Sequence, residues 1–386
     1  MGVKLSQVIL PPAMLGMLGG GQLGRFFVIA AHEMGYRVTV LDPDPHSPAG
    51  KIADVHLCAQ YDDAQALKQM AQTCVAVTTE FENVPAQTMQ TLAQDCIVRP
   101  NANAVAVAQH RALEKQFIRD AGIPVAPFVV VNQAEDLPAD DSALYPAILK
   151  VARFGYDGKG QARVANREQA KQAFADFKQA QCVLEKMLSL DYEVSVVLAR
   201  GADGNVVCFP TAENSHLNGI LDVSIVPARA PQDIHQQAKT LAIKIAQSLD
   251  YVGVLAVEFF VSEGQLLANE MAPRPHNSGH YTIDACVTSQ FEQQVRALAG
   301  LPLGDARQHS PSVMVNILGD VWYQNGQVRE PDWLKCFEHG QIKLHLYGKH
   351  EPRPARKMGH FTALDEKLEY AIEAAIKARQ NLGIGE

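Results

Sequence analysis

The 386-residue chain lacks the cysteine pairs that would mark a disulfide-bonded or zinc-binding protein. Its seven cysteines are an odd number, lie scattered along the chain and never form Cys-x-x-Cys. Disulfides persist mainly in oxidising compartments, so we expect reduced thiols and a cytoplasmic protein.

Three further absences narrow the class of protein. No apolar run approaches the length of a membrane span, and the N-terminus has no cleavage pattern of a signal peptide. The net charge is −8, so the basic excess of a general nucleic-acid binder is missing. We therefore expect neither a membrane nor a nucleic acid as a partner.

The length predicts two or three domains. The first hundred residues alternate apolar strands with helical patterns, which predicts a parallel, doubly wound (Rossmann-like) sheet. We place this domain at residues 1–108, a second at 109–300 and a small C-terminal domain at 301–386. The predicted strands are 13–18, 37–41, 74–78, 147–151, 182–186, 193–198, 253–261 and 313–318, and the predicted helices are 22–34, 64–72, 85–94, 111–120, 232–249 and 365–381.

An acidic pair stands out near residue 260. Glu258 ends an apolar run and Glu270 follows in the next strand, so the two would repel each other unless a cation lay between them. They share a face if residues 262–264 form a three-residue loop with Gly264 left-handed, or if the strand bulges. Strict alternation would turn Asn269 to the opposite face. The alternative is a solvated pair at a sheet edge.

A glycine-rich turn follows the first predicted strand. Gly19-Gly-Gly-Gln-Leu-Gly24 matches G-x-G-x-x-G, and Asp42 ends the next strand, as in a dinucleotide-binding domain. This pattern favours a nicotinamide-dependent dehydrogenase. The glycines could also serve only a tight turn, or the helix N-terminus could bind another anionic or polar ligand.

A second glycine-rich stretch covers residues 154–161 and contains Lys159. Its backbone N–H groups could close over phosphates, although it is not a Walker A loop and could be a plain hairpin tip. Lys150 lies just before it among apolar neighbours and needs a charged partner, such as a nucleotide phosphate. Residues 185–188 offer a backbone edge for adenine, and Glu193 could meet ribose hydroxyls.

These motifs together resemble the ATP-grasp superfamily. The matching segments are Phe154-Gly-Tyr-Asp-Gly-Lys-Gly-Gln161, Glu185-Lys186, Glu193, Asn214-Ser-His216 and Asn269-Glu270-x-x-Pro-Arg-Pro-His-Asn-Ser-Gly-His280. Within it, the chain is similar to the N5-carboxyaminoimidazole ribonucleotide synthetases of purine biosynthesis, also called the ATPase subunit of phosphoribosylaminoimidazole carboxylase. That similarity rests on Gly19–Gly24, Thr79-Glu80-Phe-Glu82-Asn-Val-Pro85 and Tyr347-Gly-Lys349 with Arg353-Pro-Ala-Arg356-Lys-Met-Gly-His360.

The resemblance implies an α/β and α+β protein with a doubly wound pre-ATP-grasp domain, an ATP-grasp domain and a small C-terminal domain, assembled as a homodimer. The implied activity is that of a ligase. ATP and bicarbonate would form carboxyphosphate, which itself, or through released CO₂, would carboxylate the amine of 5-aminoimidazole ribonucleotide. The products would be N5-carboxyaminoimidazole ribonucleotide, ADP and phosphate.

The resemblance also implies roles for individual residues. ATP would bind to Arg111, Lys150, Gly155, Tyr156, Asp157, Gly158, Lys159, Gly160, Gln161, Glu185, Lys186, Met187, Leu188, Glu193, His216, Asn269 and Glu270, and Mg²⁺ to Glu258 and Glu270. The catalytic group would be Arg274, His276, Asn277, Tyr156 and Asp157. The ribonucleotide would meet Gln22, Leu23, Glu80, Arg274, His276, Ser278, Lys349 and Arg356, with Glu82 as the alternative to Glu80.

Other functions stay open at this point. A formate-dependent glycinamide ribonucleotide transformylase would share the scaffold and differ in its substrate pocket. Biotin carboxylase fits less well because the chain is short for that family. A dehydrogenase built on the first domain leaves the acidic pair and residues 150–161 unexplained. A module that only binds ATP would show no turnover.

Overall fold

The computed structural model describes residues 8–153, 155, 160–324 and 327–384. The N-terminal part is a parallel sheet in the strand order β3-β2-β1-β4-β5, flanked by helices, which confirms the predicted doubly wound sheet. Its elements are β1 (Met14–Leu18), α1 (Gln22–Glu33), β2 (Arg37–Leu41), β3 (Val55–Leu57), α2 (Ala64–Thr73), β4 (Ala76–Thr79), α3 (Ala86–Leu92) and β5 (Ile97–Val98).

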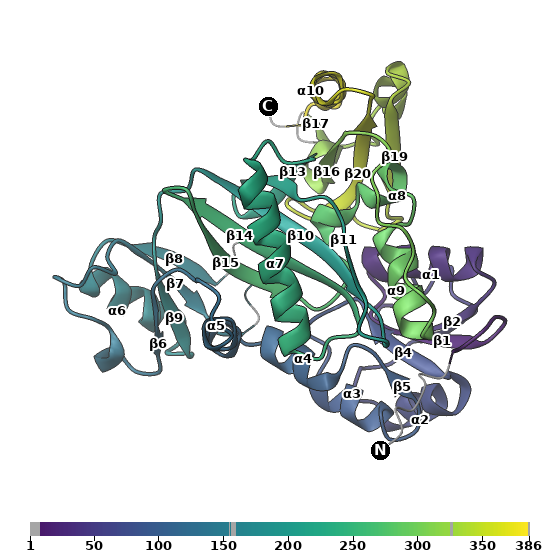
Figure 1. Cartoon of the computed structure of the whole chain (residues 1–386), viewed down its shortest axis with the longest axis horizontal. Helices are drawn as coiled ribbons and strands as arrows, with labels where there is room; N and C mark the ends of the chain where they lie inside the picture. The colour runs from purple at the N-terminus through teal and green to yellow at the C-terminus, as the bar shows by residue number, and fades with distance from the viewer. Residues whose placement is uncertain (1–7, 154, 156–159, 325–326, 385–386) are drawn as a thin grey trace.

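A small antiparallel sheet lies at one end of the molecule (Figure 1). Its strands are ordered β6-β9-β7-β8. They are β6 (Phe128–Val131), β7 (Ala147–Val151), β8 (Gln161–Val164) and β9 (Cys182–Lys186), with α6 (Arg167–Asp176) packed against them. The helices α4 (Ala102–Ala108) and α5 (Arg111–Asp120) lead into this lobe from the N-terminal sheet.

A larger antiparallel sheet occupies the middle of the molecule, with α7 across one face (Figure 1). Its order is β15-β14-β10-β12-β13-β16-β20-β19, and β11 pairs with β10. The elements are β10 (Tyr192–Arg200), β11 (Val206–Cys208), β12 (Ala212–Leu217), β13 (Ile220–Val226), α7 (Gln232–Ser248), β14 (Gly253–Ser262), β15 (Gln265–Ala272), β16 (Ser312–Leu318), β19 (Ile342–Leu346) and β20 (Lys357–Leu364).

The C-terminal strands extend this same sheet across residue 300, and α10 (Leu368–Asn381) packs on them. The domain limits at residues 108 and 300 therefore stay predictions. A further helix, α9 (Gln290–Ala299), packs Phe291 and Val295 into the core of the N-terminal sheet, so distant parts of the chain share one core. Besides short 3-10 helices, the described chain also contains α8 (Thr282–Ala285), β17 (Tyr323–Gln324) and β18 (Gln327–Val328).

The hairpin of β14 and β15 corrects one prediction. Ser262 pairs with Gln265, so the loop has two residues, Glu263 and Gly264, both with positive φ (51° and 72°). The predicted three-residue loop is wrong. The predicted alternative, a bulge, is present: Glu258 pairs with Glu270 while Phe259 pairs with Ala268. The bulge accommodates one extra residue and returns the two carboxylates to opposing positions.

Among the described residues, no helix is both long and apolar enough to cross a membrane.

Candidate active site

A cavity of about 1240 Å³ opens where the N-terminal sheet, the small lobe and the large sheet meet. It brings together most of the residues singled out in the sequence, from segments hundreds of residues apart. These are Gln22, Leu23, Glu80, Arg111, Lys150, Gly155, Gln161, Glu193, His216, Glu258, Asn269, Glu270, Arg274, His276, Asn277, Lys349 and Arg356. Tyr156, Asp157, Gly158 and Lys159 lie outside the described residues.

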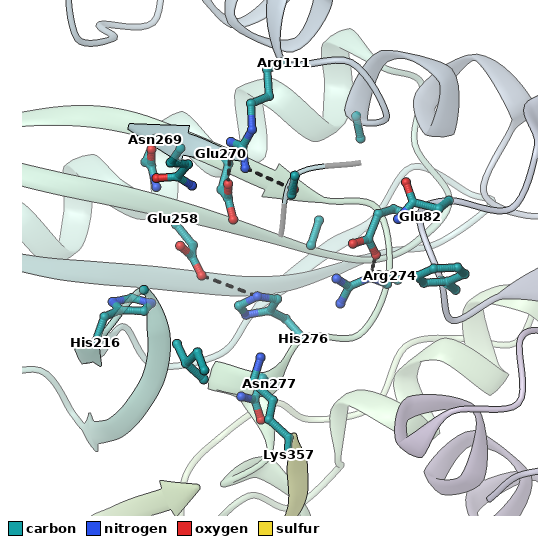
Figure 2. A pocket seen from close by; sticks show the side chains of 18 of the residues that line it. Glu82, Arg111, His216, Glu258, Asn269, Glu270, Arg274, His276, Asn277 and Lys357 are labelled. Atoms are coloured by element: carbon teal, nitrogen blue, oxygen red, sulfur yellow. Dashed lines mark hydrogen bonds and ion pairs between the residues drawn. The ribbon is translucent and has the colours of Figure 1, made fainter. Parts of the chain in front are cut away.

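The acidic pair lies on the wall of this cavity (Figure 2). Arg111 Nη1 is 3.1 Å from Glu270 Oε2. Burial by itself would raise the pKa of Glu270, but Arg111 and Lys150 outweigh it and hold that pKa below its ordinary value. Burial raises the pKa of Glu258, and the neighbouring Glu270 raises it further. The two carboxylates thus repel each other, and Glu270 loses its proton more easily than Glu258. A cation bound between them would relieve this repulsion.

Asn269, the extra residue at the bulge, also lines the cavity. Its Oδ1 is buried and accepts no hydrogen bond from any described residue. An unpaired buried oxygen beside two carboxylates fits a hard cation such as Mg²⁺. Within the described residues no group of three or more His, Cys, Asp or Glu is arranged to hold a metal. A cation here would therefore need oxygens from the substrate as well.

A buried charge cluster lies behind the cavity in the small lobe. Glu185 Oε2 is 3.0 Å from Lys115 Nζ and 3.1 Å from Lys150 Nζ. Burial alone would raise the pKa of Glu185, yet the two lysines lower it to about 2. Glu185 is thus the charged partner that Lys150 was predicted to need. The sequence analysis missed Lys115, which is fully buried on α5.

The predicted adenine edge, residues 185–188, does not line the cavity. Glu185, Lys186, Met187, Leu188 and Gly160 are not among its described lining residues. The N–H groups of Lys186 and Met187 donate to the carbonyls of Pro127 and Pro146. Glu193 Oε2 lies 3.1 Å from His216 Nδ1, and both line the cavity.

Further along the cavity, Arg274 forms an ion pair with Glu82 (Figure 2). His276 lies next to it, and burial lowers the pKa of this imidazole to about 3, with Arg274 adding to the effect. Asn277 has a buried side-chain oxygen and nitrogen, neither with a partner in the described part of the chain. A guanidinium, a neutral imidazole and an unsatisfied amide therefore face one space, which suits a small planar anion.

Ser278 does not reach the cavity. It was predicted to contact the substrate, but it is fully buried, and its hydroxyl contacts His276 and Ser195 behind the imidazole ring. A direct contact with a ligand is therefore excluded in this arrangement.

The glycine turn of the N-terminal domain already binds carboxylates of the protein itself. Glu80 accepts hydrogen bonds from the N–H groups of Gly21 (2.7 Å) and Gly24 (3.1 Å), and Asp42 accepts one from Gly20 (2.7 Å). Any side chain at position 21 would meet the Glu80 carboxylate at 2.6 Å. The amides that a dinucleotide pyrophosphate would use are occupied, which weighs against the dehydrogenase.

Basic residues from the loop before β20 and from the start of that strand line the far end of the cavity. Lys349 and Arg356 lie there as predicted, and Arg353 and Lys357 join them. Figure 2 shows Lys357 below Asn277, on the side of the cavity away from Arg111. The sequence analysis missed Arg353 and Lys357 as site residues, although both belong to the segment that it quoted.

Two antiparallel sheets around one cavity, with the buried Lys150 on one and a carboxylate pair on the other, define an ATP-grasp ligase. The family comparisons agree: the ATP-grasp domain matches residues 116–291, the ribonucleotide synthetase preATP-grasp domain 13–109, and the phosphoribosylaminoimidazole carboxylase C-terminal domain 312–374. The N5-carboxyaminoimidazole ribonucleotide synthase of Bacillus subtilis is 45% identical over 363 residues, covering 93% of either chain. The chain therefore belongs to the N5-carboxyaminoimidazole ribonucleotide synthase family.

Further relatives share the sequence and the fold. The synthase of Brucella melitensis is 45% identical over 358 residues, 92% of this chain and 97% of its own. The crystal structure of an ADP complex of an N5-carboxyaminoimidazole ribonucleotide synthetase superposes with a TM-score of 0.88 at 42% identity over 98% of both chains. The Aspergillus clavatus synthase in complex with ADP and 5-aminoimidazole ribonucleotide gives a TM-score of 0.85 at 31% identity, over 96% of this chain and 98% of its own. The predicted fold class is confirmed.

Proposed function

We propose that the protein carboxylates 5-aminoimidazole ribonucleotide in purine biosynthesis, using ATP and bicarbonate and forming N5-carboxyaminoimidazole ribonucleotide, ADP and phosphate. One observation carries the proposal. A single cavity holds the opposed pair Glu258 and Glu270 at one end, Arg274 and His276 in its middle and a basic segment at the other. Such a cavity can hold a nucleoside triphosphate, a small anion and the phosphate of a ribonucleotide side by side.

At the nucleotide end, the roles follow from charge. Glu258 and Glu270 would hold Mg²⁺, with the Asn269 oxygen beside them, and the bound cation would neutralise charge on the transferred phosphoryl group. Arg111 and Lys150 line the same end and can contact phosphate oxygens. Glu193 and His216 line this end and would contact the ribose. The Leu188 backbone, which lies outside the lining residues, would meet the adenine edge.

In the middle of the cavity, Arg274, His276 and Asn277 would bind and orient bicarbonate. A bicarbonate oxygen attacks the γ-phosphorus of ATP, ADP leaves, and carboxyphosphate forms. The exocyclic amine then attacks the carboxyl carbon, directly or after CO₂ has been released, and loses a proton, while phosphate departs. Arg274 keeps its charge throughout and matches a planar carboxylate.

At the far end, Lys349 and Arg356 would bind the 5′-phosphate of the ribonucleotide, with Arg353 close by. Gln22 and Leu23 are the first two residues of α1, where backbone N–H groups have no intrahelical partner, so they can donate to the substrate. Glu80 already accepts from two amides, whereas Glu82 is paired with Arg274.

We further propose that the enzyme is a homodimer in the cytoplasm. All seven cysteines are free, which fits a reducing compartment. The homodimer rests on the family alone and is tested by light scattering in solution.

The test of the proposed function is a substrate exchange. ADP release is followed with Mg-ATP and bicarbonate, and either 5-aminoimidazole ribonucleotide or glycinamide ribonucleotide with formate is added. We expect release with the first substrate and none with the second. The reverse result would assign the chain to the transformylase reaction, and ATP binding without turnover on either substrate would leave only a binding module.

A further inference from the structure

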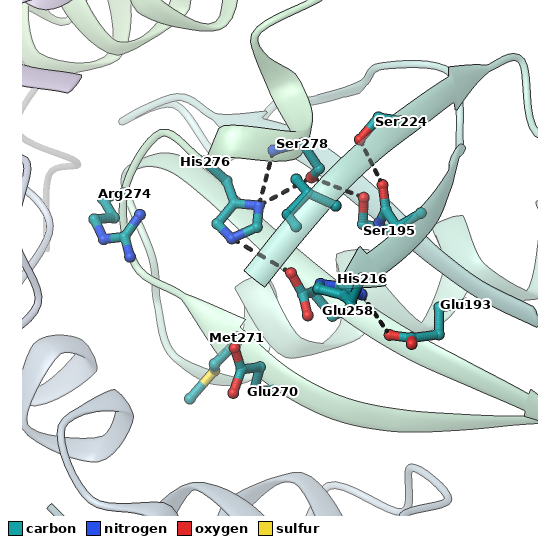
Figure 3. Close-up of polar contacts among 12 residues, drawn as sticks. Glu193, Ser195, His216, Ser224, Glu258, Glu270, Met271, Arg274, His276 and Ser278 are labelled. Atoms are coloured by element: carbon teal, nitrogen blue, oxygen red, sulfur yellow. Dashed lines mark hydrogen bonds and ion pairs between the residues drawn. The ribbon is translucent and has the colours of Figure 1, made fainter. Parts of the chain in front are cut away.

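A directional chain of hydrogen bonds ends on the His276 ring (Figure 3). Ser195 Oγ donates to Ser278 Oγ at 2.8 Å, and Ser278 Oγ lies 2.9 Å from His276 Nδ1. The backbone N–H of Ser278 also points at Nδ1, at 3.3 Å. Both serines are almost completely buried, so water does not compete for these bonds.

The two contacts that Ser278 makes with Nδ1 set the tautomer of the ring, because its backbone N–H can only donate. Because Ser278 Oγ accepts the Ser195 hydrogen, the hydrogen of Ser278 itself is directed to Nδ1. With a second donor, the Ser278 amide, aimed at the same atom, Nδ1 cannot carry a hydrogen. The ring hydrogen is therefore on Nε2.

The backbone of His276 is held as firmly as its ring. The His276 N–H donates to Gln290 Oε1 at 2.9 Å, and Gln290 Nε2 donates to the His276 carbonyl at 2.8 Å. Gly279 permits this approach, since a Cβ there would meet Gln290 at 2.6 Å. Only a rotation of the ring about its side-chain bonds could change which nitrogen faces the cavity, and the serine chain opposes that rotation.

Nε2 faces Glu258. Its distance to Glu258 Oε1 is 3.4 Å, beyond the range of about 2.7–3.2 Å for a good N–H···O bond. Ser195 pairs directly with Glu258 in the β10–β14 ladder, so the two side chains leave the sheet on the same face. Residues of the sheet thus lie at both ring nitrogens. The Nε2–H makes only a long contact with Glu258, so it can donate a hydrogen bond to a ligand in the cavity.

We infer that Ser195 and Ser278 are positioning residues that hold His276 as the Nε2–H tautomer, so that it donates a hydrogen bond to an oxygen of the bicarbonate-derived group. This inference rests on the proposed carboxylation. It excludes a role of the Nε2 atom as the base that takes the proton of the attacking amine. Neither serine touches the substrate.

The first test reads the tautomer directly. Protein labelled with ¹⁵N-histidine is examined by ¹⁵N–¹H correlation NMR at neutral pH, and the His276 signals are assigned by their loss in His276→Asn. We expect an unprotonated Nδ1 and a protonated Nε2. A protonated Nδ1 in the wild-type protein would overturn the inference, whatever the enzyme's activity.

The second test uses matched variants. Ser278→Ala and Ser195→Ala should give mixed tautomers and lower kcat/KM for bicarbonate by about 5- to 10-fold, the fold-change of one neutral hydrogen bond. Ser195→Thr keeps the hydroxyl and should restore both readouts. Ser224→Ala is the control, because Ser224 donates to Asn214 in the same sheet at 2.7 Å and does not touch His276.

The outcomes separate the two proposals. Unchanged kcat/KM for bicarbonate in both alanine variants, or losses equal to those of Ser224→Ala, would refute the positioning role. A wild-type protein with the Nε2–H tautomer that fails to carboxylate the ribonucleotide would instead refute the proposed function alone.

Discussion

Glu270 has a charged neighbour on either side, Arg111 on one and Glu258 on the other. Glu270→Gln keeps the shape and removes the negative charge, so the cation loses a ligand. We predict that ATP turnover falls on the order of 100-fold or more while the fold stays intact. ADP release measures the loss, and circular dichroism with the unfolding temperature checks the fold. Activity near that of the wild type would remove the metal role of Glu270.

Glu114 is a second acid with an unusual pKa. It is buried on α5 beside the cavity, and its Oε1 accepts a hydrogen bond from the Met271 N–H at 2.6 Å, just after the bulge. Burial raises its pKa to about 8, and Glu270 adds to the rise. Glu114 therefore accepts the hydrogen bond from the β15 backbone mostly in its protonated, neutral form.

The sign of the pH effect follows from this shift. Between about pH 5 and about pH 8 the unfolded chain has lost the Glu114 proton while the folded protein still holds it, so the stability contributed by this group falls as pH rises. Glu114→Gln cannot titrate. We predict that the unfolding temperature of the variant, relative to that of the wild type, increases as pH rises through this window. Both are measured without nucleotide and with a chelator. A difference that stays constant with pH would contradict the raised pKa.

At the residue scale, the sequence allowed prediction of those side chains that stand in dense motifs. Arg274, His276 and Asn277 are examples, because several polar residues beside two prolines have few structural uses. Lys115 and Glu114 could not be found, since they occupy ordinary positions of an amphipathic helix. Only the fold shows that their side chains are buried against Glu185 and the bulged strand.

Among the secondary-structure elements, the β14–β15 hairpin decides the site. Its two-residue loop alone would turn Glu270 away from Glu258, and the bulge at Asn269 reverses that. The bulge was considered as an alternative from the sequence, but the loop length was predicted wrongly. Glu263 has a positive φ, which is unfavourable for a glutamate and leaves no trace in the residue pattern.

This turn yields a stability prediction. Glu263→Asn places at the first turn position a residue that tolerates a left-handed backbone, followed by Gly264 as in the common Asn-Gly turn. We predict an increase of about 0.5–1 kcal/mol in the free energy of unfolding with unchanged activity, since the loop does not line the cavity. Denaturant titration measures it, and Glu263→Ala serves as the control without a gain. A loss of stability in Glu263→Asn would contradict the assigned turn.

For the molecule as a whole, the N-terminal fold was predictable because strand and helix patterns alternate there regularly. The long antiparallel sheet was predicted only in pieces. Its strand β12 is rich in polar residues and β20 mixes polar with apolar ones, and its pairing joins segments from residue 192 to residue 364. Such long-range pairing depends on neighbours that a local pattern does not specify.

The whole fold also separates a nucleotide ligase from a dehydrogenase. The carboxylates of Glu80 and Asp42 occupy the amides of the glycine turn, whereas the cavity presents cations and a carboxylate pair for Mg-ATP. We predict that Mg-ATP raises the unfolding temperature by mass action and that NADH leaves it unchanged. An unfolding temperature that NADH raises and Mg-ATP does not would contradict the ligase and favour the dehydrogenase.

The most direct measurement follows the bicarbonate carbon. The enzyme is incubated with Mg-ATP, ¹³C-bicarbonate and 5-aminoimidazole ribonucleotide, and ¹³C NMR and ADP release are recorded together. We predict a carbamate carbon bonded to the exocyclic nitrogen, formed in equal amount to ADP. ADP formed without any ¹³C on the ribonucleotide, or no ADP at all with this substrate, would contradict the proposed carboxylation.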